Sequence, residues 1–158
     1  MLKIDSHQHF WEYEPVKHGW IDDNMSVIRK NFLPADLEPL LKENDINGCI
    51  AVQADQTETE TDFLLGLQKE NDFIRGIVGW VDLRAENIEE RLAQYKQYNA
   101  IKGFRHILQG EDPSFMLQPD FVSGRAFQIF FNKNIARNAR NMFFNQGSVV
   151  GKKSYTIG

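Results

Sequence analysis

The sequence predicts an α/β fold in which four β/α units follow one another along the chain. Four apolar, strand-like segments alternate with segments that carry apolar residues at helical spacing. Most connections between them are short, a pattern typical of right-handed β-α-β units in a parallel sheet. A complete eight-stranded β/α barrel takes about 250 residues, whereas this chain has 158. We therefore expect a partial (β/α)8 TIM-type barrel made of about the first four units.

The first strand ends in a polar segment. The apolar run Met1 to Ile4 leads directly into Asp5, His7 and His9, which alternate with other residues. Alternate side chains of a strand point to one face, so these three share a face. Two imidazoles side by side can bind one divalent ion, but a catalytic zinc site needs further ligands and an open position. A His-x-His pair alone is a weak signal, and here it makes half a site at most.

A long polar and aromatic loop is expected from Phe10 to about Phe32. Long loops in compact domains often form lids or walls of binding sites, and a surface excursion pinned by its aromatic residues is an equal alternative. We expect His18, within this loop, to be exposed and not to bind a ligand.

The first helix is expected to begin at Pro34, since proline suits a first turn. Leu37, Leu40 and Leu41 have the spacing of one buried stripe, although Pro39 interrupts the pattern.

The remaining units follow in order. The second strand, Ile46 to Ala54, is apolar on both faces, as strands covered by helices tend to be. Thr57-x-x-Glu60 has the form of a capping box. The helix that it opens should bury Phe63, Leu64 and Leu67. The third strand is expected at Ile74 to Leu83, and the fourth at Ala100 to Leu108. The helix between them is marked by Ile88, Leu92 and Tyr95.

Composition places the chain among soluble globular proteins. It is 42% hydrophobic and 25% charged, which are ordinary values. We find no signal-peptide pattern and no apolar run near the ~20 residues of a membrane span, so we expect a cytoplasmic protein without a membrane segment. Cys49 is the only cysteine, which excludes an internal disulfide framework. Its apolar surroundings in the sequence predict a core residue and not a nucleophile.

The charge changes sign near Gly124. Residues 1–124 contain 12 Lys and Arg against 22 Asp and Glu, a balance of −10, whereas residues 125–158 contain 6 Lys and Arg and no acid. We predict two parts, a barrel portion over 1–124 and a divergent, basic, Asn-rich tail over 125–158, for which a shifted reading frame is one origin. Helical spacing is present from Ala126 to Phe144, and the end from Gly147 should be frayed. The dispersed basic residues lack any nucleic-acid-binding motif, so we do not expect nucleic acid as a partner.

Polar side chains follow every predicted strand. In parallel β/α barrels the active site lies where the strands end. The candidate site residues at these ends are His7, His9, Gln53, Trp80, Arg105 and His106.

Six segments of the chain resemble the amidohydrolase-related barrel family, within it the sugar-lactone hydrolases such as fuconolactonase, with the pyrone-dicarboxylate lactonases as relatives. The resemblance runs in order from residue 1 to about residue 124. The segments are Ile4 to Trp11, Gly19 to Ile21, Phe32 to Pro34, Val52 to Ala54, Gly79 to Leu83 and Gly103 to His106.

The resemblance implies hydrolysis of a carbohydrate lactone, in which water adds to the carbonyl. It implies that His7 and His9 are catalytic and either bind a divalent metal, zinc or manganese, or polarise the carbonyl, since some of these lactonases work without a metal. It also implies that four residues contact the substrate. The alternatives are that the glutamine and the tryptophan only pack in the core, that the arginine only forms a salt bridge, and that the histidine only caps its strand. These residues are Gln53, Trp80, Arg105 and His106.

One feature of the family is missing. Its later strands supply another histidine and the aspartate that activates water, but this chain has no histidine after His106 and no acid after Asp120. Base catalysis is typically worth ~10²–10⁴-fold in rate, so we expect a shortened and impaired hydrolase. The alternative is a non-catalytic half barrel that self-associates through its open edges.

Overall fold

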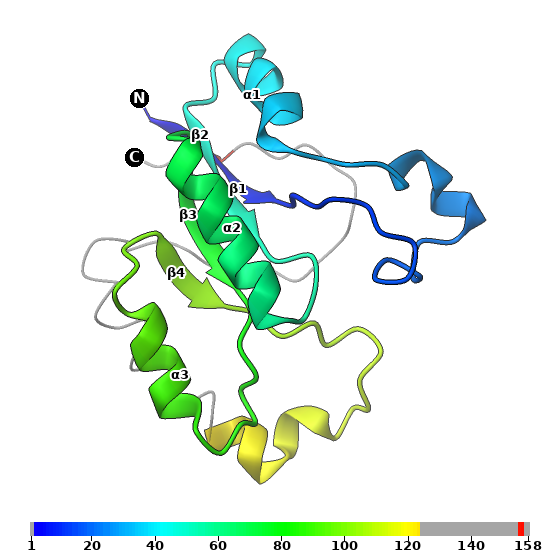
Figure 1. Ribbon diagram of the computed structural model, residues 1–158, viewed down its shortest axis with the longest axis vertical. Coiled ribbons are helices and arrows are strands. Elements are labelled where there is room, and N and C mark those ends of the chain that lie inside the picture. The colour runs from blue at the N-terminus through cyan, green and yellow to red at the C-terminus, as the bar shows by residue number, and fades with distance from the viewer. Residues whose placement is uncertain (1, 124–154, 157–158) are drawn as a thin grey trace.

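One sheet organises the molecule. The computed structural model describes residues 2–123 and 155–156 (Figure 1). Its strands lie in the order β4-β3-β2-β1-β5, and β1 to β4 are parallel. The strands are β1 (Lys3–Gln8), β2 (Gly48–Val52), β3 (Ile74–Gly79), β4 (Ile101–Phe104) and β5 (Tyr155–Thr156). The predicted α/β fold with four parallel strands is confirmed.

Helices alternate with these strands. α1 (Pro34–Glu43) follows the long loop, α2 (Glu58–Glu70) connects β2 to β3, and α3 (Ile88–Tyr95) connects β3 to β4. Figure 1 shows α2 lying along the strands at the centre of the sheet, and α3 beside β4. None of the helices within residues 2–123 is both long and apolar enough to cross a membrane.

The buried residues of β2 explain its apolar sequence. Cys49 and Ala51 belong to the main core between the sheet and its helices, whereas Ile50 and Val52 belong to a second cluster with Val78. Both faces of the strand are therefore covered, as predicted for a parallel sheet. Cys49 is a core residue, and burial raises the pKa of its thiol to about 12.

The buried faces of α1 and α3 are only partly as predicted. Ile88, Leu92 and Tyr95 are all buried in α3. In α1, however, Leu41 is buried and Leu37 packs on the core, while Leu40 is 55% exposed. The expected three-leucine stripe is wrong at Leu40, because α1 contacts the core along a narrower face than the spacing allowed.

The strands are shorter than the apolar runs that predicted them. β3 ends at Gly79 and β4 at Phe104, although the apolar runs continue to Leu83 and Leu108. Val81 and Leu83 are buried all the same. Their apolar character therefore reflects packing of the connections on the core, outside the hydrogen-bonded ladder.

The long loop is a closed, ordered excursion. The Trp11 N–H donates to the Phe32 carbonyl at 3.0 Å, and the Phe32 N–H donates back to the Trp11 carbonyl at 2.9 Å. A 3-10 helix, η1 (Asp23–Ile28), forms its far part. The prediction that His18 is exposed is wrong: it is 1% exposed. Its ring stacks on Tyr13 with centroids 5.8 Å apart, so it fills the interior of the loop.

Most of the predicted tail lies outside the described residues, including the helical pattern from Ala126 to Phe144. Within the end that we expected to be frayed, Tyr155–Thr156 form β5, which pairs antiparallel with β1.

Candidate active site at the strand ends

His7 and His9 converge, as the alternation along the first strand predicts. His7 belongs to β1, and His9 follows the end of that strand. Their Nε2 atoms lie 3.1 Å apart, and the rings meet edge to face with centroids 4.8 Å apart. The two imidazoles therefore point at a common position.

The neighbouring strand fixes the orientation of His9. Its Nδ1 donates to the carbonyl oxygen of Val52, the last residue of β2, at 2.9 Å. The proton on Nδ1 leaves Nε2 of the neutral ring as an acceptor, and this atom lies within hydrogen-bond distance of His7 Nε2. Burial lowers the pKa of His9 to about 4, and the charges of His7 and Arg105 also lower it. At neutral pH the ring is thus uncharged, which is the form that binds a metal or accepts a proton.

Arg105 completes this cluster from the far side of the sheet. Its Nη1 lies 3.4 Å from His7 Nε2. Burial lowers the pKa of His7, and the charge of Arg105 lowers it further, while Asp5 opposes the change. In residues 2–123, none of the ion pairs involves Arg105. The guanidinium is thus available to an anionic or strongly polar ligand.

Gln53 and Trp80 stand at the ends of β2 and β3. Gln53 is fully buried, and its Nε2 donates to the Arg105 carbonyl at 3.2 Å. Its Oε1 and the indole Nε1 of Trp80 are buried without a hydrogen-bond partner among the described residues. Buried polar atoms are normally paired, so these two are candidates for ligand contacts.

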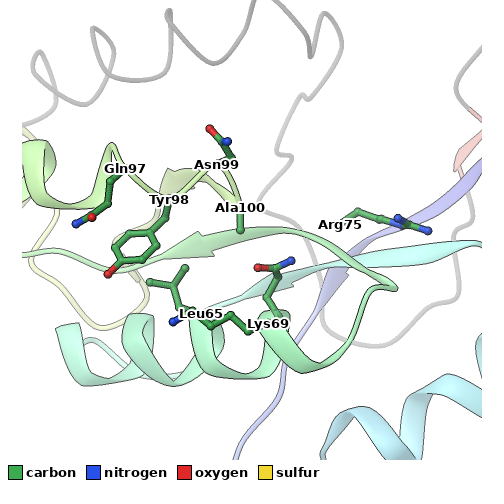
Figure 2. A pocket seen from close by; sticks show the side chains of 8 residues that line it. Leu65, Lys69, Arg75, Gln97, Tyr98, Asn99 and Ala100 are labelled. Atoms are coloured by element: carbon green, nitrogen blue, oxygen red, sulfur yellow. The ribbon is translucent and has the colours of Figure 1, made fainter.

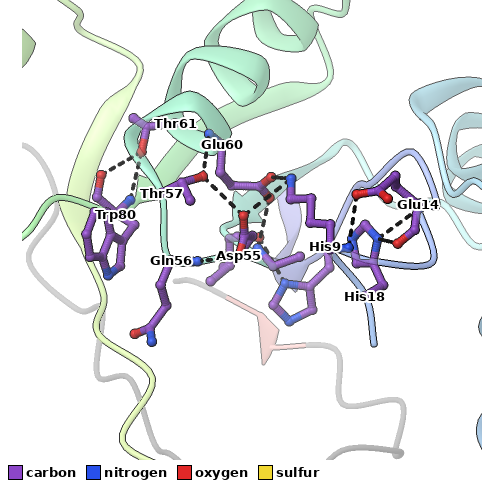
Figure 3. Close-up of polar contacts among 12 residues, drawn as sticks. His9, Glu14, His18, Asp55, Gln56, Thr57, Glu60, Thr61 and Trp80 are labelled. Carbon is purple, nitrogen blue, oxygen red and sulfur yellow. Dashed lines mark hydrogen bonds and ion pairs between the residues drawn. The ribbon is translucent and has the colours of Figure 1, made fainter. Parts of the chain in front are cut away.

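Thr61 holds Trp80 in place, and sequence reasoning missed it. Its hydroxyl donates to the Trp80 carbonyl at 2.7 Å and accepts the Trp80 N–H at 2.8 Å (Figure 3). A Cβ at Gly79 would lie 2.7 Å from the Thr61 side chain, so the close approach requires glycine. No sequence motif marks this contact, because the two residues are 19 positions apart.

His106 is placed differently from the other predicted site residues. Its Nε2 lies 3.0 Å from Glu111 Oε1, and its ring stacks on Phe115 with centroids 4.8 Å apart. The contacts of its ring are thus with the segment after β4. Its role in substrate binding remains a prediction.

A separate hollow lies at the opposite ends of the strands. It has a volume of about 400 Å³ and lies where β3 and β4 begin (Figure 2). Lys69, Arg75 and Tyr98 are among the residues that line it. None of the predicted site residues lines this hollow, so it does not belong to the candidate active site.

The histidine pair fits part of a metal site. Two imidazole nitrogens bound to one zinc at about 2.0–2.1 Å in tetrahedral geometry lie about 3.3–3.4 Å apart, and the observed Nε2 separation is slightly shorter, 3.1 Å. Residues 2–123 contain no group of three or more His, Cys, Asp or Glu side chains that could hold a metal. His7 and His9 can therefore supply two ligands, and further ligands must come from elsewhere.

Several known proteins are similar to this chain over most of its length. No protein-family model matches the chain. The chain is 41% identical over 128 residues to an L-fucono-1,5-lactonase of Burkholderia multivorans, covering 80% of this chain and 43% of the relative. It is 33% identical over 108 residues to an L-fucono-1,5-lactonase of Burkholderia ambifaria, covering 68% and 37%. A crystal structure of an amidohydrolase from Burkholderia multivorans with bound zinc superposes with a TM-score of 0.77 at 41% identity, over 80% of this chain and 45% of that one. The chain belongs to this amidohydrolase family.

The family resemblance seen in the sequence is thus confirmed. A probable 2-pyrone-4,6-dicarboxylic acid hydrolase from Acinetobacter baumannii shares the fold alone, with a TM-score of 0.63 at 18% identity over 84% of this chain and 47% of that one. The chain spans less than half the length of the relatives that it matches. It therefore forms a partial barrel of the amidohydrolase type.

Proposed function

We propose that the chain carries the first half of a sugar-lactone hydrolase site, which acts on an L-fuconolactone-like substrate. In this reaction, water adds to the lactone carbonyl, the ring C–O bond breaks and an aldonate forms. The proposal rests on the convergence of His7, His9 and Arg105. The histidines come from the end of β1 and the arginine follows β4, yet His7 Nε2 lies 3.1 Å from His9 Nε2 and 3.4 Å from Arg105 Nη1. The similarity to L-fucono-1,5-lactonases supports the choice of substrate.

His7 and His9 either bind a divalent metal or polarise the lactone carbonyl directly. Both rings are favoured in the neutral form by lowered pKa values. A divalent metal, zinc or manganese, would act as a Lewis acid when bound by this pair. Without it, His7 is the imidazole that can donate an N–H to the carbonyl oxygen, because the proton of His9 is held on Nδ1 by the Val52 carbonyl. In either case Arg105 donates to the oxygen on which negative charge develops, or to the carboxylate of the product.

Gln53 and Trp80 recognise the sugar hydroxyls. Gln53 Oε1 and Trp80 Nε1 have no hydrogen-bond partner among residues 2–123. One hydroxyl can donate to this oxygen, and another can accept from this N–H. An unsatisfied buried polar atom costs about 1–3 kcal/mol, so pairing with substrate favours binding at these positions.

We further propose that residues 1–158 by themselves open the lactone slowly. The family takes its water-activating aspartate from the last strand, and this chain has no acid after Asp120. Loss of general base catalysis lowers rates by ~10²–10⁴-fold. We also propose that the chain divides into a barrel portion, 1–124, and a divergent tail, 125–158, which arose from a shifted reading frame. We propose a cytoplasmic location as well. The DNA that follows the codon for Gly124 tests the origin of the tail.

The test is lactone ring opening by the purified chain. L-fuconolactone, with and without added Zn²⁺ or Mn²⁺, should open slowly but faster with wild type than with His7→Ala or Arg105→Gln. Equilibrium binding of the aldonate should be measured on the same variants, since it requires no general base. Rates and affinities that are equal in wild type and both variants would refute the proposal.

A second candidate is a half barrel that pairs with another copy of itself. The position of β4 at the edge of the sheet favours this candidate, because edge strands pair readily with other chains. The molar mass in sedimentation equilibrium decides between the two. A monomer that opens lactones excludes the non-catalytic candidate, and an inactive dimer supports it.

A further inference from the structure

The long loop is tied to α2 at a buried carboxylate. Lys17, in the loop, places its Nζ 3.2 Å from Glu60 Oε2 and 3.5 Å from Asp55 Oδ2. The side chain of Glu60 is 1% exposed and that of Lys17 is 36% exposed. A carboxylate so deeply buried is stable in its charged form only if partners satisfy it. Lys17 is its cationic partner, and it comes from a segment distant in the sequence.

A local turn fixes the backbone of Lys17 before its side chain reaches α2. The carboxylate of Glu14 accepts the N–H of Val16 at 3.1 Å and of Lys17 at 2.9 Å. The His18 N–H donates to the Glu14 carbonyl at 2.8 Å, and its Nδ1 accepts the Glu14 N–H at 3.0 Å. The hydrogen bonds of this turn therefore hold the backbone of Lys17 in a position from which its side chain contacts Glu60.

The second oxygen of Glu60 contacts the segment after β2. Its Oε1 accepts the Ala54 N–H at 3.0 Å. Ala54 lies two residues after Val52, whose carbonyl accepts from His9 Nδ1 at 2.9 Å. Figure 3 shows Glu60 at the start of its helix, in the same group of polar side chains as Asp55 and His9. One carboxylate thus joins the loop to the strand end that orients His9.

We propose that Glu60 is a positioning residue. It holds the Glu14–His18 turn of the 10–32 loop through Lys17, and it holds the strand end that orients His9 through Ala54. Removal of Lys17 leaves the buried carboxylate of Glu60 without its cationic partner, so the position of the loop and the charge of Glu60 are coupled. The loop then forms a fixed wall beside the histidine pair. Its consequence for lactone binding rests on the proposed function, but the positioning itself does not.

Hydrogen exchange on the full chain tests the coupling. Lys17→Met and Glu60→Gln should each speed exchange of the His18 and Ile21 amides by at least ~10-fold, and leave the amides of α3 unchanged. The double variant should exchange no faster than the single variants, because no buried charge is left unpaired. Lys17→Arg, which keeps the charge, should restore protection. Lys42→Met is the matched control, since it removes an exposed pair with Glu38.

The ring resonances of His9 provide the readout that a loop anchor alone would not change. In Glu60→Gln the His9 Hε1 resonance should shift, and in Lys42→Met it should not. Unchanged loop exchange in Lys17→Met, single effects that multiply in the double variant, or an unmoved His9 resonance would each overturn the proposal. Lactone opening is measured separately, so its absence in wild type refutes the proposed function and leaves this test intact.

Discussion

His9 and His106 follow parallel strands at nearly equivalent positions, yet their rings have different surroundings. His9 is anchored by the Val52 carbonyl on the neighbouring strand and meets His7. His106 instead pairs with Glu111 and stacks on Phe115, both from the segment that follows it. Position at a strand end therefore does not decide the role of a histidine. The partner of its ring nitrogens decides where the ring points.

The largest difference should appear when each ring is removed. His9→Ala takes away one of two converging nitrogens, so Zn²⁺ affinity, measured by calorimetry, should fall at least ~100-fold. His106→Ala should change that affinity less than ~3-fold, because its ring is engaged with Glu111. Equal losses in the two variants would show that His106 turns into the site when metal binds.

A second test uses the titration of His9. Its pKa is lowered from 6.5 to about 4 in the folded state, so the unfolded chain takes up the proton first as pH falls. The contribution of His9 to stability is complete above pH 6.5 and is lost as pH falls toward 4, by on the order of 3 kcal/mol. Urea unfolding between pH 7 and 4 measures this loss.

His9→Asn is the control for the other titrating groups. Only the difference between the two pH profiles belongs to the His9 ring. Parallel profiles would mean that the folded protein does not keep this ring neutral.

The smallest effect on stability is expected at Thr61, whose hydroxyl bonds to the backbone of Trp80 after β3. Thr61→Val removes the hydroxyl that pairs with the N–H and carbonyl of Trp80, so stability to urea should fall by about 1–2 kcal/mol. Thr61→Ser keeps the hydroxyl and should retain most of that pairing. The indole fluorescence of Trp80 should change in the valine variant alone, which a Trp80→Phe background confirms. A serine variant as altered as the valine variant would assign the effect to packing.

Much of the scaffold could be predicted from the sequence because its signals are local. Strand alternation predicted the convergence of His7 and His9, and helical spacing predicted the buried face of α3. Leu40 and His18 were misjudged for one common reason: burial depends on which distant surface an element meets, and no local pattern records that surface.

The site was predictable only in part for the same reason. Residues at strand ends could be named, but their hydrogen-bond partners could not. Thr57-x-x-Glu60 indicated a capping box, in which Glu60 would bind its own helix terminus. Thr57 does accept the Glu60 N–H at 3.2 Å, while the carboxylate of Glu60 bonds to Ala54 and Lys17 instead. A cation 43 residues away is thus one of the partners that the carboxylate of Glu60 has in place of the one that the local rule assigns.

The closure of the long loop at Trp11 and Phe32 has an evolutionary consequence. Because its two ends meet, the 20 residues between them form a cassette that can be exchanged without moving the barrel. A loop of different sequence can then replace it, provided that the new loop brings a positive charge to Glu60 or is accompanied by a neutral residue at that position.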